Sequence, residues 1–291
     1  MNETRRLIIG GSLALFAGLC FSSGGFFVRS LPIDQWEIVF FRCLFAGLGI
    51  LIYLIFTERR NTVKTILKAG WPGLLIGLVT AWAIIAYVLA MQTTLVANVL
   101  ALMATATIIV PILSGPLLGE RVPLSTWIAV IFGITGILLM VFEAAGTGQL
   151  VGNILAFTIA LAIAAQTLIA RRFRSSSMIP SVLIGATLAG IVSLPLALPI
   201  ETTIKDVFIL AAFGITTLAI ALILYFTAAR FLPAPTLILV VLIDAVLAPI
   251  WVWIGFGELP NLFTFIGAAI ILAGVTYNSS FAILKLSFRS K

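Results

Sequence analysis

Histidine is absent from this 291-residue chain, and charged residues make up only 9% of it. The missing imidazoles exclude Ser-His and Cys-His catalysis, histidine-ligated metals and histidine proton relays. The scarcity of charge argues against an ordinary soluble domain, in which about 25% of residues are charged. Apolar residues instead make up 62% of the chain, as is typical of an integral membrane protein.

Cysteine is nearly absent as well. Cys20 and Cys43 both lie inside apolar runs, which excludes a disulfide framework and a cysteine-based zinc site. The chain has no GxxxxGK[ST] loop, so ATP does not energise it directly. The sequence therefore predicts no catalytic residue, no metal and no cofactor.

Long apolar runs dominate what is present. A helix needs about 20 apolar residues to cross the hydrocarbon core of a bilayer. The first run has no obvious cleavage site and is followed by others, so it indicates a membrane span rather than a signal peptide. We predict an all-α polytopic membrane protein with ten transmembrane helices, near residues 7–28, 36–56, 70–90, 95–115, 124–143, 151–170, 178–198, 207–228, 235–255 and 262–284.

The net charge of +7 follows the membrane topology. With ten helices and an inner N-terminus, 14 of the 17 basic residues fall at inner helix ends, and only Arg29 and Lys205 fall in outer loops. This is the positive-inside pattern. The basic excess therefore indicates cytoplasmic termini and a lipid bilayer as partner, and no nucleic acid.

One ten-residue phrase occurs twice. "PILSGPLLGE" (111–120) returns 138 residues later as "PIWVWIGFGE" (249–258), and the same offset places Tyr87 opposite Tyr225. This predicts two five-helix repeats, 1–145 and 146–291. Because five is odd, the second repeat must be inverted in the membrane, a plan typical of secondary transporters with a substrate site near the midplane.

Two longer stretches carry a family resemblance. "WEIVFFRCLFAGLGIL" (36–51) and "YVLAMQTTLVANVLALMATATIIVPILSGPLLGERVPLSTWIAVIFGITGILLM" (87–140) resemble the second helix and the helix 3 to helix 5 block of EamA-type members of the drug/metabolite transporter superfamily. The first helix departs from many relatives, since "CFSSGGFFVRS" has no tryptophan. The resemblance implies two inverted EamA repeats around a central cavity, in a bacterial inner membrane.

The resemblance also implies a function. It is closest to bacterial exporters of amino acids, including aromatic ones, which export small-molecule substrates without ATP. Transport of drugs or of other metabolites, such as nucleotide sugars or purines, remains the alternative within this fold. An intramembrane enzyme is disfavoured because an aspartyl protease needs two membrane carboxylates, and Ser22 and Ser23 have no base at membrane depth. A channel would be expected to show a charge ring or a filter loop.

Asp244 is the leading candidate for chemistry. It lies in the middle of the ninth apolar run, where a carboxyl usually faces an aqueous cavity or a paired charge. It could contact a substrate ammonium or carry a coupling proton; a structural acid paired with Arg42 is the alternative. For Arg42 itself we expect snorkelling or an ion pair with Asp34, Glu37 or Asp244, with a clamp on a substrate carboxylate as the other reading.

Neutral polar and aromatic residues within the runs suit an amphipathic solute, although helix packing explains small residues equally well. Pro111 and Pro249 each remove a backbone donor, so we expect hinges there. Glu120 and Glu258 fall at helix ends and could anchor loops or form gate contacts. The candidates for lining the cavity, besides Asp244, are Ser22, Ser23, Gly24, Trp82, Tyr87, Asn98, Thr105, Gln166 and Thr217.

Overall fold

The computed structural model describes residues 3–93, 96–141 and 150–257, with 262–263, 266–267, 269–274 and 276–277. Every regular element in these segments is helical. The α-helices are α1 (Glu3–Ser22), α2 (Gly24–Arg29), α3 (Gln35–Glu58), α4 (Thr62–Lys68), α5 (Gly70–Thr93), α6 (Val96–Ala104), α7 (Ala106–Leu118), α8 (Leu124–Val141), α9 (Leu150–Arg172), α10 (Ile179–Ser193), α11 (Ile204–Gly214), α12 (Ala221–Ala228), α13 (Ala234–Val241) and α14 (Ile243–Phe256). A 3₁₀ turn, η1 (Arg59–Asn61), precedes α4, and a π-helical segment, η2 (Ile215–Ile220), joins α11 to α12.

These helices match the predicted membrane spans. By length and composition, six helices of the described part can cross a membrane, and three apolar helices are shorter. The expected run at 262–284 is described only in fragments, and the expected repeat boundary at 145/146 lies outside the described residues. We number the other spans in chain order: span 1 is α1 with α2, span 2 is α3, span 3 is α5, span 4 is α6 with α7, span 5 is α8, span 6 is α9, span 7 is α10, span 8 is α11 with η2 and α12, and span 9 is α13 with α14.

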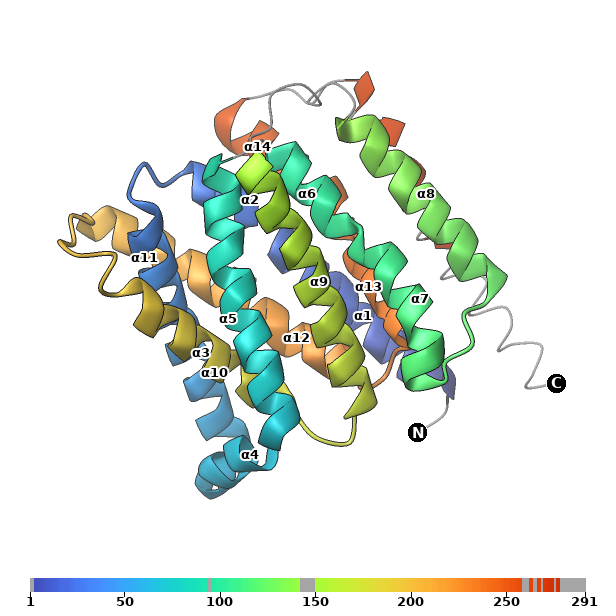
Figure 1. Cartoon of the computed structure of the whole chain (residues 1–291), viewed down its shortest axis with the longest axis horizontal. Helices are drawn as coiled ribbons and strands as arrows, with labels where there is room; N and C mark the ends of the chain where they lie inside the picture. Colours follow the sequence, from blue (N-terminus) through green and yellow to red (C-terminus); the bar gives the residue numbers. More distant parts are fainter. Residues whose placement is uncertain are drawn as a thin grey trace.

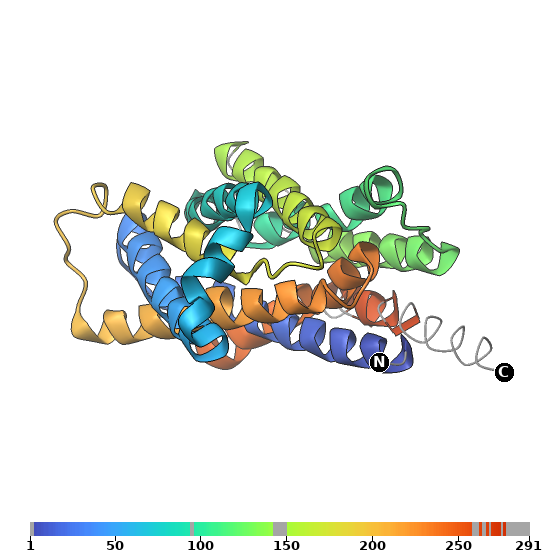
Figure 2. The ribbon, with the colours of Figure 1, turned by 90° about the horizontal axis from the view of Figure 1, so that it is seen from below.

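The spans form two layers (Figures 1 and 2). One layer holds spans 7, 3, 6, 4 and 5 as successive neighbours, and the other holds spans 2, 8, 1 and 9. Each layer therefore mixes helices from both repeats. Each span has a counterpart in the other repeat: 1 with 6, 2 with 7, 3 with 8 and 4 with 9. When every span is replaced by its counterpart, the neighbours in one layer become the neighbours in the other. The sequence repeat is thus also a repeat of helix packing.

Small residues allow the helices to approach closely. A Cβ atom built on Gly214 of α11 would overlap the carbonyl oxygen of Arg42 on α3. A Cβ on Gly185 of α10 would lie 2.9 Å from the carbonyl oxygen of Gly77 on α5. In a bilayer, where lipid is as apolar as leucine, such close packing is a main source of attraction between helices.

Spans 4 and 9 are interrupted at equivalent places. α6 gives way to α7 at Thr105, and α13 gives way to α14 at Leu242. Both sites make the same tight hydrogen bond: the Ile108 amide donates to the Thr105 carbonyl (3.0 Å), and the Ala245 amide donates to the Leu242 carbonyl (3.1 Å). These i to i+3 bonds keep the backbone satisfied at the interruption, as hydrocarbon requires.

The predicted hinge prolines lie beyond these interruptions. Pro111 is inside α7, six residues after Thr105, and Pro249 is inside α14, seven residues after Leu242. The helices continue through both prolines. A hinge at either proline stays a prediction, whereas the interrupted backbone lies about two turns earlier in each span.

The glycine of the Gly-Glu pair at the end of each repeated ten-residue segment is explained by the local backbone conformation. Gly119 follows α7 with φ of 67°, and Gly257 follows α14 with φ of 70°. This left-handed conformation ends a helix at little cost only when the residue is glycine. In the first copy, the chain then turns so that Glu120 faces the neighbouring helix ends.

We expect Gly214→Ala to destabilise the protein by about 1–3 kcal/mol, because the added methyl group must push α11 away from α3. The melting temperature of the purified protein in detergent measures this. Gly47→Ala on α3 is the matched control, since its Cβ would meet only Leu183 Cδ1, at 3.8 Å. Equal melting temperatures for the two variants would contradict the close approach.

Candidate functional site

Span 1 is broken inside the polar patch predicted from the sequence. α1 ends at Ser22 and α2 begins at Gly24. The hydroxyl of Ser22 donates to the Leu19 carbonyl (2.6 Å) and accepts from Trp251 Nε1 (2.7 Å), and the Ser23 hydroxyl donates to the Cys20 carbonyl (2.8 Å). Ser22 thereby ties the break in span 1 to α14 of the second repeat. The hydroxyls act here as structural links.

Tyr87 of α5 reaches this break. A Cβ atom on Gly24 would lie 2.6 Å from the Tyr87 hydroxyl oxygen, so a larger residue would have to displace the tyrosine. Tyr87 also interacts electrostatically with both Arg42 and Asp244. Spans 1, 2, 3 and 9 therefore converge at this tyrosine, and two repeats contribute to the convergence.

Arg42 occupies an aromatic environment. It lies on α3 with only 5% of its surface exposed, and its guanidinium carbon is 4.2 Å from the centre of the Phe213 ring and 5.1 Å from that of Tyr87. Nη2 donates to the Thr217 hydroxyl (3.2 Å), whereas Nε and Nη1 are buried without a hydrogen-bond partner. None of the three expected ion pairs of Arg42 is formed in the described part of the chain.

The acids near Arg42 in the sequence are engaged elsewhere. Asp34 accepts from the Trp36 amide (2.7 Å) and so caps α3, and Glu37 accepts from the Thr202 hydroxyl and from the Glu201 amide (3.3 Å). Local capping and a loop contact satisfy both carboxylates. The ion-pair expectation was wrong because it used distance along the chain and ignored these competing partners.

Asp244 is the second residue of α14, two residues after the interruption of span 9. Its side chain is half-buried, so part of its surface is accessible. Discontinuous helices of this kind often carry the binding groups of secondary transporters, and the position of Asp244 at the membrane centre stays a prediction.

Spans 6 and 8 meet through a second pair of polar residues. The Thr167 hydroxyl donates to the Ile163 carbonyl (2.6 Å), and therefore it accepts from the Tyr225 hydroxyl. Gln166 is buried next to Thr167. Thr217 lies in the π-helical η2 and donates to the Phe213 carbonyl (2.7 Å) while accepting from Arg42.

The remaining candidates lie apart from Tyr87 or outside the described side chains. Trp82 is 46% exposed and donates from Nε1 to the Thr158 hydroxyl (3.0 Å), joining α5 to α9. Thr105 donates to the Leu102 carbonyl (2.6 Å) at the interruption of span 4. Asn98 is in α6, and its side chain is outside the described part.

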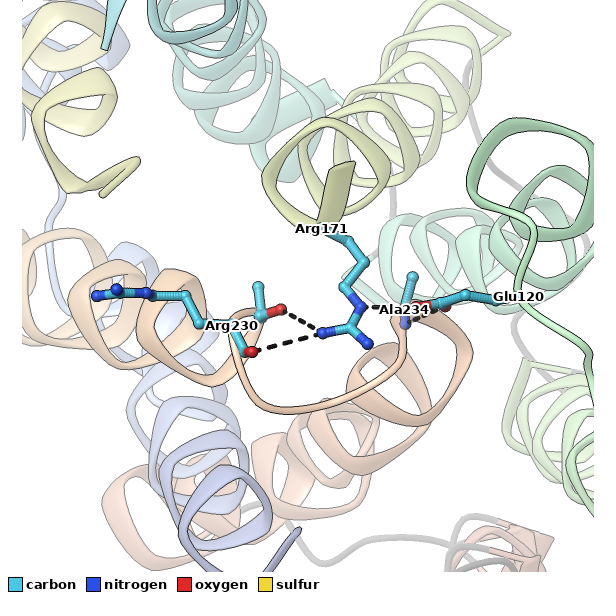
Figure 3. A network of polar contacts seen from close by, with 5 residues as sticks. Glu120, Arg171, Arg230 and Ala234 are labelled. Carbon is cyan, nitrogen blue, oxygen red and sulfur yellow. Dashed lines mark hydrogen bonds and ion pairs between the residues drawn. The ribbon is translucent and has the colours of Figure 1, made fainter. Parts of the chain in front are cut away.

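A polar network joins four helix ends where α9 terminates in Arg171 and Arg172 (Figure 3). We call this the arginine-rich end of the bundle. Arg171, at the end of α9, donates from Nε to Glu120 Oε1 (2.6 Å) and from Nη1 to the carbonyls of Ala229 (3.3 Å) and Arg230 (3.5 Å). Glu120 Oε2 accepts from the Ala234 amide (3.0 Å). We call these residues the Glu120–Arg171 clamp.

The clamp holds the turn between α12 and α13 from both sides. Arg171 binds the carbonyls that follow α12, and Glu120 binds the first amide of α13, so each charge meets the helix end whose dipole favours it. The two side chains are only 9% and 18% exposed. Partial burial and additional hydrogen bonds distinguish this pair from an exposed ion pair, which contributes about 0–1 kcal/mol. Sequence reasoning identified Glu120 but missed Arg171, because only the fold brings them together.

The repeated helix packing agrees with the comparisons to known proteins. The model of the EamA-like transporter family matches residues 8–142 and 150–280. The chain belongs to the EamA-like transporter family. Two matched segments in one EamA chain confirm the repeat read from the sequence, and the family makes this chain a membrane transporter.

A solved structure shares the EamA fold of this chain. It is titled only as the crystal structure of a protein, and it aligns with a TM-score of 0.78 and 17% sequence identity over 97% of this chain and 98% of its own. At this identity the likeness concerns the fold alone. No curated protein matches the sequence.

We expect Glu120→Gln to loosen the turn between α12 and α13 of this EamA protein. Losing a charged hydrogen bond of about 1.5–3 kcal/mol should speed amide exchange in a peptide covering 229–236 by about ten- to hundredfold. Hydrogen–deuterium exchange in detergent measures the effect. Glu58→Gln is the control, since Glu58 accepts from the Thr65 hydroxyl (3.0 Å) at a different site. Unchanged exchange in Glu120→Gln would show that the clamp does not hold the turn.

Proposed function

We propose that this EamA-like transporter exports small amphipathic metabolites, most of all amino acids including aromatic ones, from the cytoplasm of a bacterial cell. It would work as a secondary transporter by alternating access between the two repeats, in the inner membrane and with both termini cytoplasmic. The observation that carries the proposal is the convergence of groups from both repeats at Tyr87: Gly24 at the break in span 1, Arg42 of span 2 and Asp244 of span 9. A hydroxyl on an aromatic ring, a cation and a carboxylate suit a solute that is partly polar and partly apolar.

The interruptions of spans 1, 4 and 9 support the conformational part of the proposal. Alternating access requires one end of a helix to move while the other stays packed. A span divided into two helices provides such a joint without leaving backbone groups unbonded. We place the joints at Thr105 and Leu242, with the following prolines as further hinge candidates.

The Glu120–Arg171 clamp supplies a closure for one end. It fastens the ends of spans 4, 6, 8 and 9 together, and the positive-inside pattern places that end at the cytoplasm. In the second repeat, Glu258 follows Gly257 as Glu120 follows Gly119, and Arg29 ends α2 as Arg171 stands at the end of α9. Glu258 lies outside the described residues.

Asp244 has two roles open to it within this mechanism. A carboxylate beside Tyr87 can attract the ammonium group of an amino acid, or it can exchange a proton with the solvent as a coupling ion. Both roles need the accessible surface that Asp244 retains.

The proposed function is tested with purified protein in liposomes. A panel of radiolabelled amino acids should give counterflow above that of protein-free liposomes, for at least one neutral amino acid. The panel is repeated with and without a pH gradient. Flux that does not depend on the pH gradient would exclude proton coupling. A complete lack of flux would exclude amino acids as substrates.

We expect Asp244→Asn to lower this flux at least about tenfold, because losing a charge-assisted contact of about 1.5–3 kcal/mol weakens binding or coupling by that factor. Asp206→Asn is the matched control, since the Asp206 carboxylate accepts from the amide and the hydroxyl of Thr203 in the exposed capping box of α11. Size-exclusion profiles should be the same for both variants. Full flux in Asp244→Asn would exclude Asp244 from the mechanism.

A further inference from the structure

Arg42 carries a positive charge that the described protein leaves without a counter-charge. It is 5% exposed, and one nitrogen, Nη2, has a hydrogen-bond partner in Thr217. Nε and Nη1 are buried and unpartnered. A buried arginine usually has its donors satisfied, and an unsatisfied one in a native site calls for an explanation.

The aromatic contacts compensate only part of this burial. A cation over an aromatic face gains less free energy than the effective penalty of removing an ion from water, even after relaxation. Phe213 and Tyr87 together therefore leave a deficit. An anion at the free donors would offset it.

The free donors have the geometry for a planar anion. A guanidinium offers two edges, each with a parallel pair of N–H groups: Nη1 with Nη2, and Nε with Nη2. Thr217 accepts one N–H of Nη2 and so occupies one edge at most, which leaves the other edge complete. That edge matches both oxygens of a carboxylate. Nε and Nη1 are covered in the described conformation, so an anion reaches this edge after the side chains that cover it move, as they do in alternating access.

The surroundings of Arg42 connect it to the polar cluster already described. Tyr87 contacts its guanidinium and also feels the charge of Asp244, and the tyrosine hydroxyl reaches the break in span 1. Thr217 belongs to the π-helical η2, a type of segment that often marks functional sites. Arg42 and Asp244 do not pair with each other in the described structure.

We propose that Arg42 binds an anionic group of the transported solute, and that a carboxylate is the group its free edge fits. The inference rests on the proposed function and narrows it: the carboxylate of the substrate binds Arg42, while Asp244 stays available for a positively charged group of the same substrate. Arg42 thereby becomes a specificity-determining residue, in the role of the carboxylate clamp that the sequence left open as its second reading.

The test uses the amino acid with the highest flux in the liposome panel. Its own unlabelled form, its α-amide, its decarboxylated amine and its deaminated acid compete with the labelled compound. In the wild-type protein, the two compounds with a carboxylate should inhibit at concentrations at least about tenfold lower than the amide and the amine, as expected for a charge-assisted pair. This arm needs no variant to fold.

Two variants assign the preference to Arg42. In Arg42→Gln the inhibitory concentration of the amide, divided by that of the amino acid, should fall close to one. In Arg42→Lys, which keeps the charge without the paired edge, this ratio should fall to an intermediate value. Equal inhibition by amide and amino acid in the wild type would overturn the inference while leaving transport intact. An Arg42→Gln variant with the same ratio of inhibitory concentrations as the wild type would also overturn the inference. A wild type that carries no member of the panel would instead overturn the proposed function, and this inference with it.

Discussion

In hydrocarbon, each backbone N–H and C=O must find a partner within the protein, and this constraint governs where the chain can depart from a regular helix. The departures in the described part are few and each is compensated. Ser22 and Ser23 donate to carbonyls of the preceding turn, Thr105 and Leu242 accept i to i+3 bonds, and η2 widens to a π-helical turn. These irregular places in spans 1, 4, 8 and 9 lie beside or carry candidate site residues, among them Ser22, Thr105, Thr217 and Asp244. The irregular backbone and the candidate residues therefore coincide.

Two arginines, Arg171 and Arg42, show two ways in which the protein accommodates a charge removed from solvent. At the arginine-rich end, Arg171 and Glu120 satisfy each other and two helix ends, so the ion pair fastens structure. In the interior, Arg42 has aromatic rings and one hydroxyl but no acid, so its charge is held ready for a group that comes from outside. The contrast rests on how many donors are occupied, not on burial, since both arginines are largely removed from solvent.

Sequence alone predicts the spans and the repeat, because hydrophobic length and a ten-residue phrase are both local patterns. It also identifies Ser22, Tyr87, Thr217 and Asp244, which are polar residues in apolar runs. It does not predict the partners. Asp34 and Glu37 stand close to Arg42 in the chain, but an amide cap and a loop hydroxyl bind them. The cap has a sequence signature, an aspartate directly before an apolar helix, whereas the contact between Glu37 and Thr202 has none. Arg171 and Trp251 were missed because their roles depend on helices more than 50 residues away.

The mixed layers have a consequence for how the protein is made. Spans 3, 4 and 5 pack in one layer with spans 6 and 7, while spans 1 and 2 belong to the layer of spans 8 and 9. As the chain emerges from the ribosome, the first five helices enter the bilayer before any of their cross-repeat neighbours exist. Their contact surfaces must then rest against lipid until the second half is synthesised. Neither half can complete its helix packing alone, and lipid covers the contact surfaces of the first half until the second half packs against them.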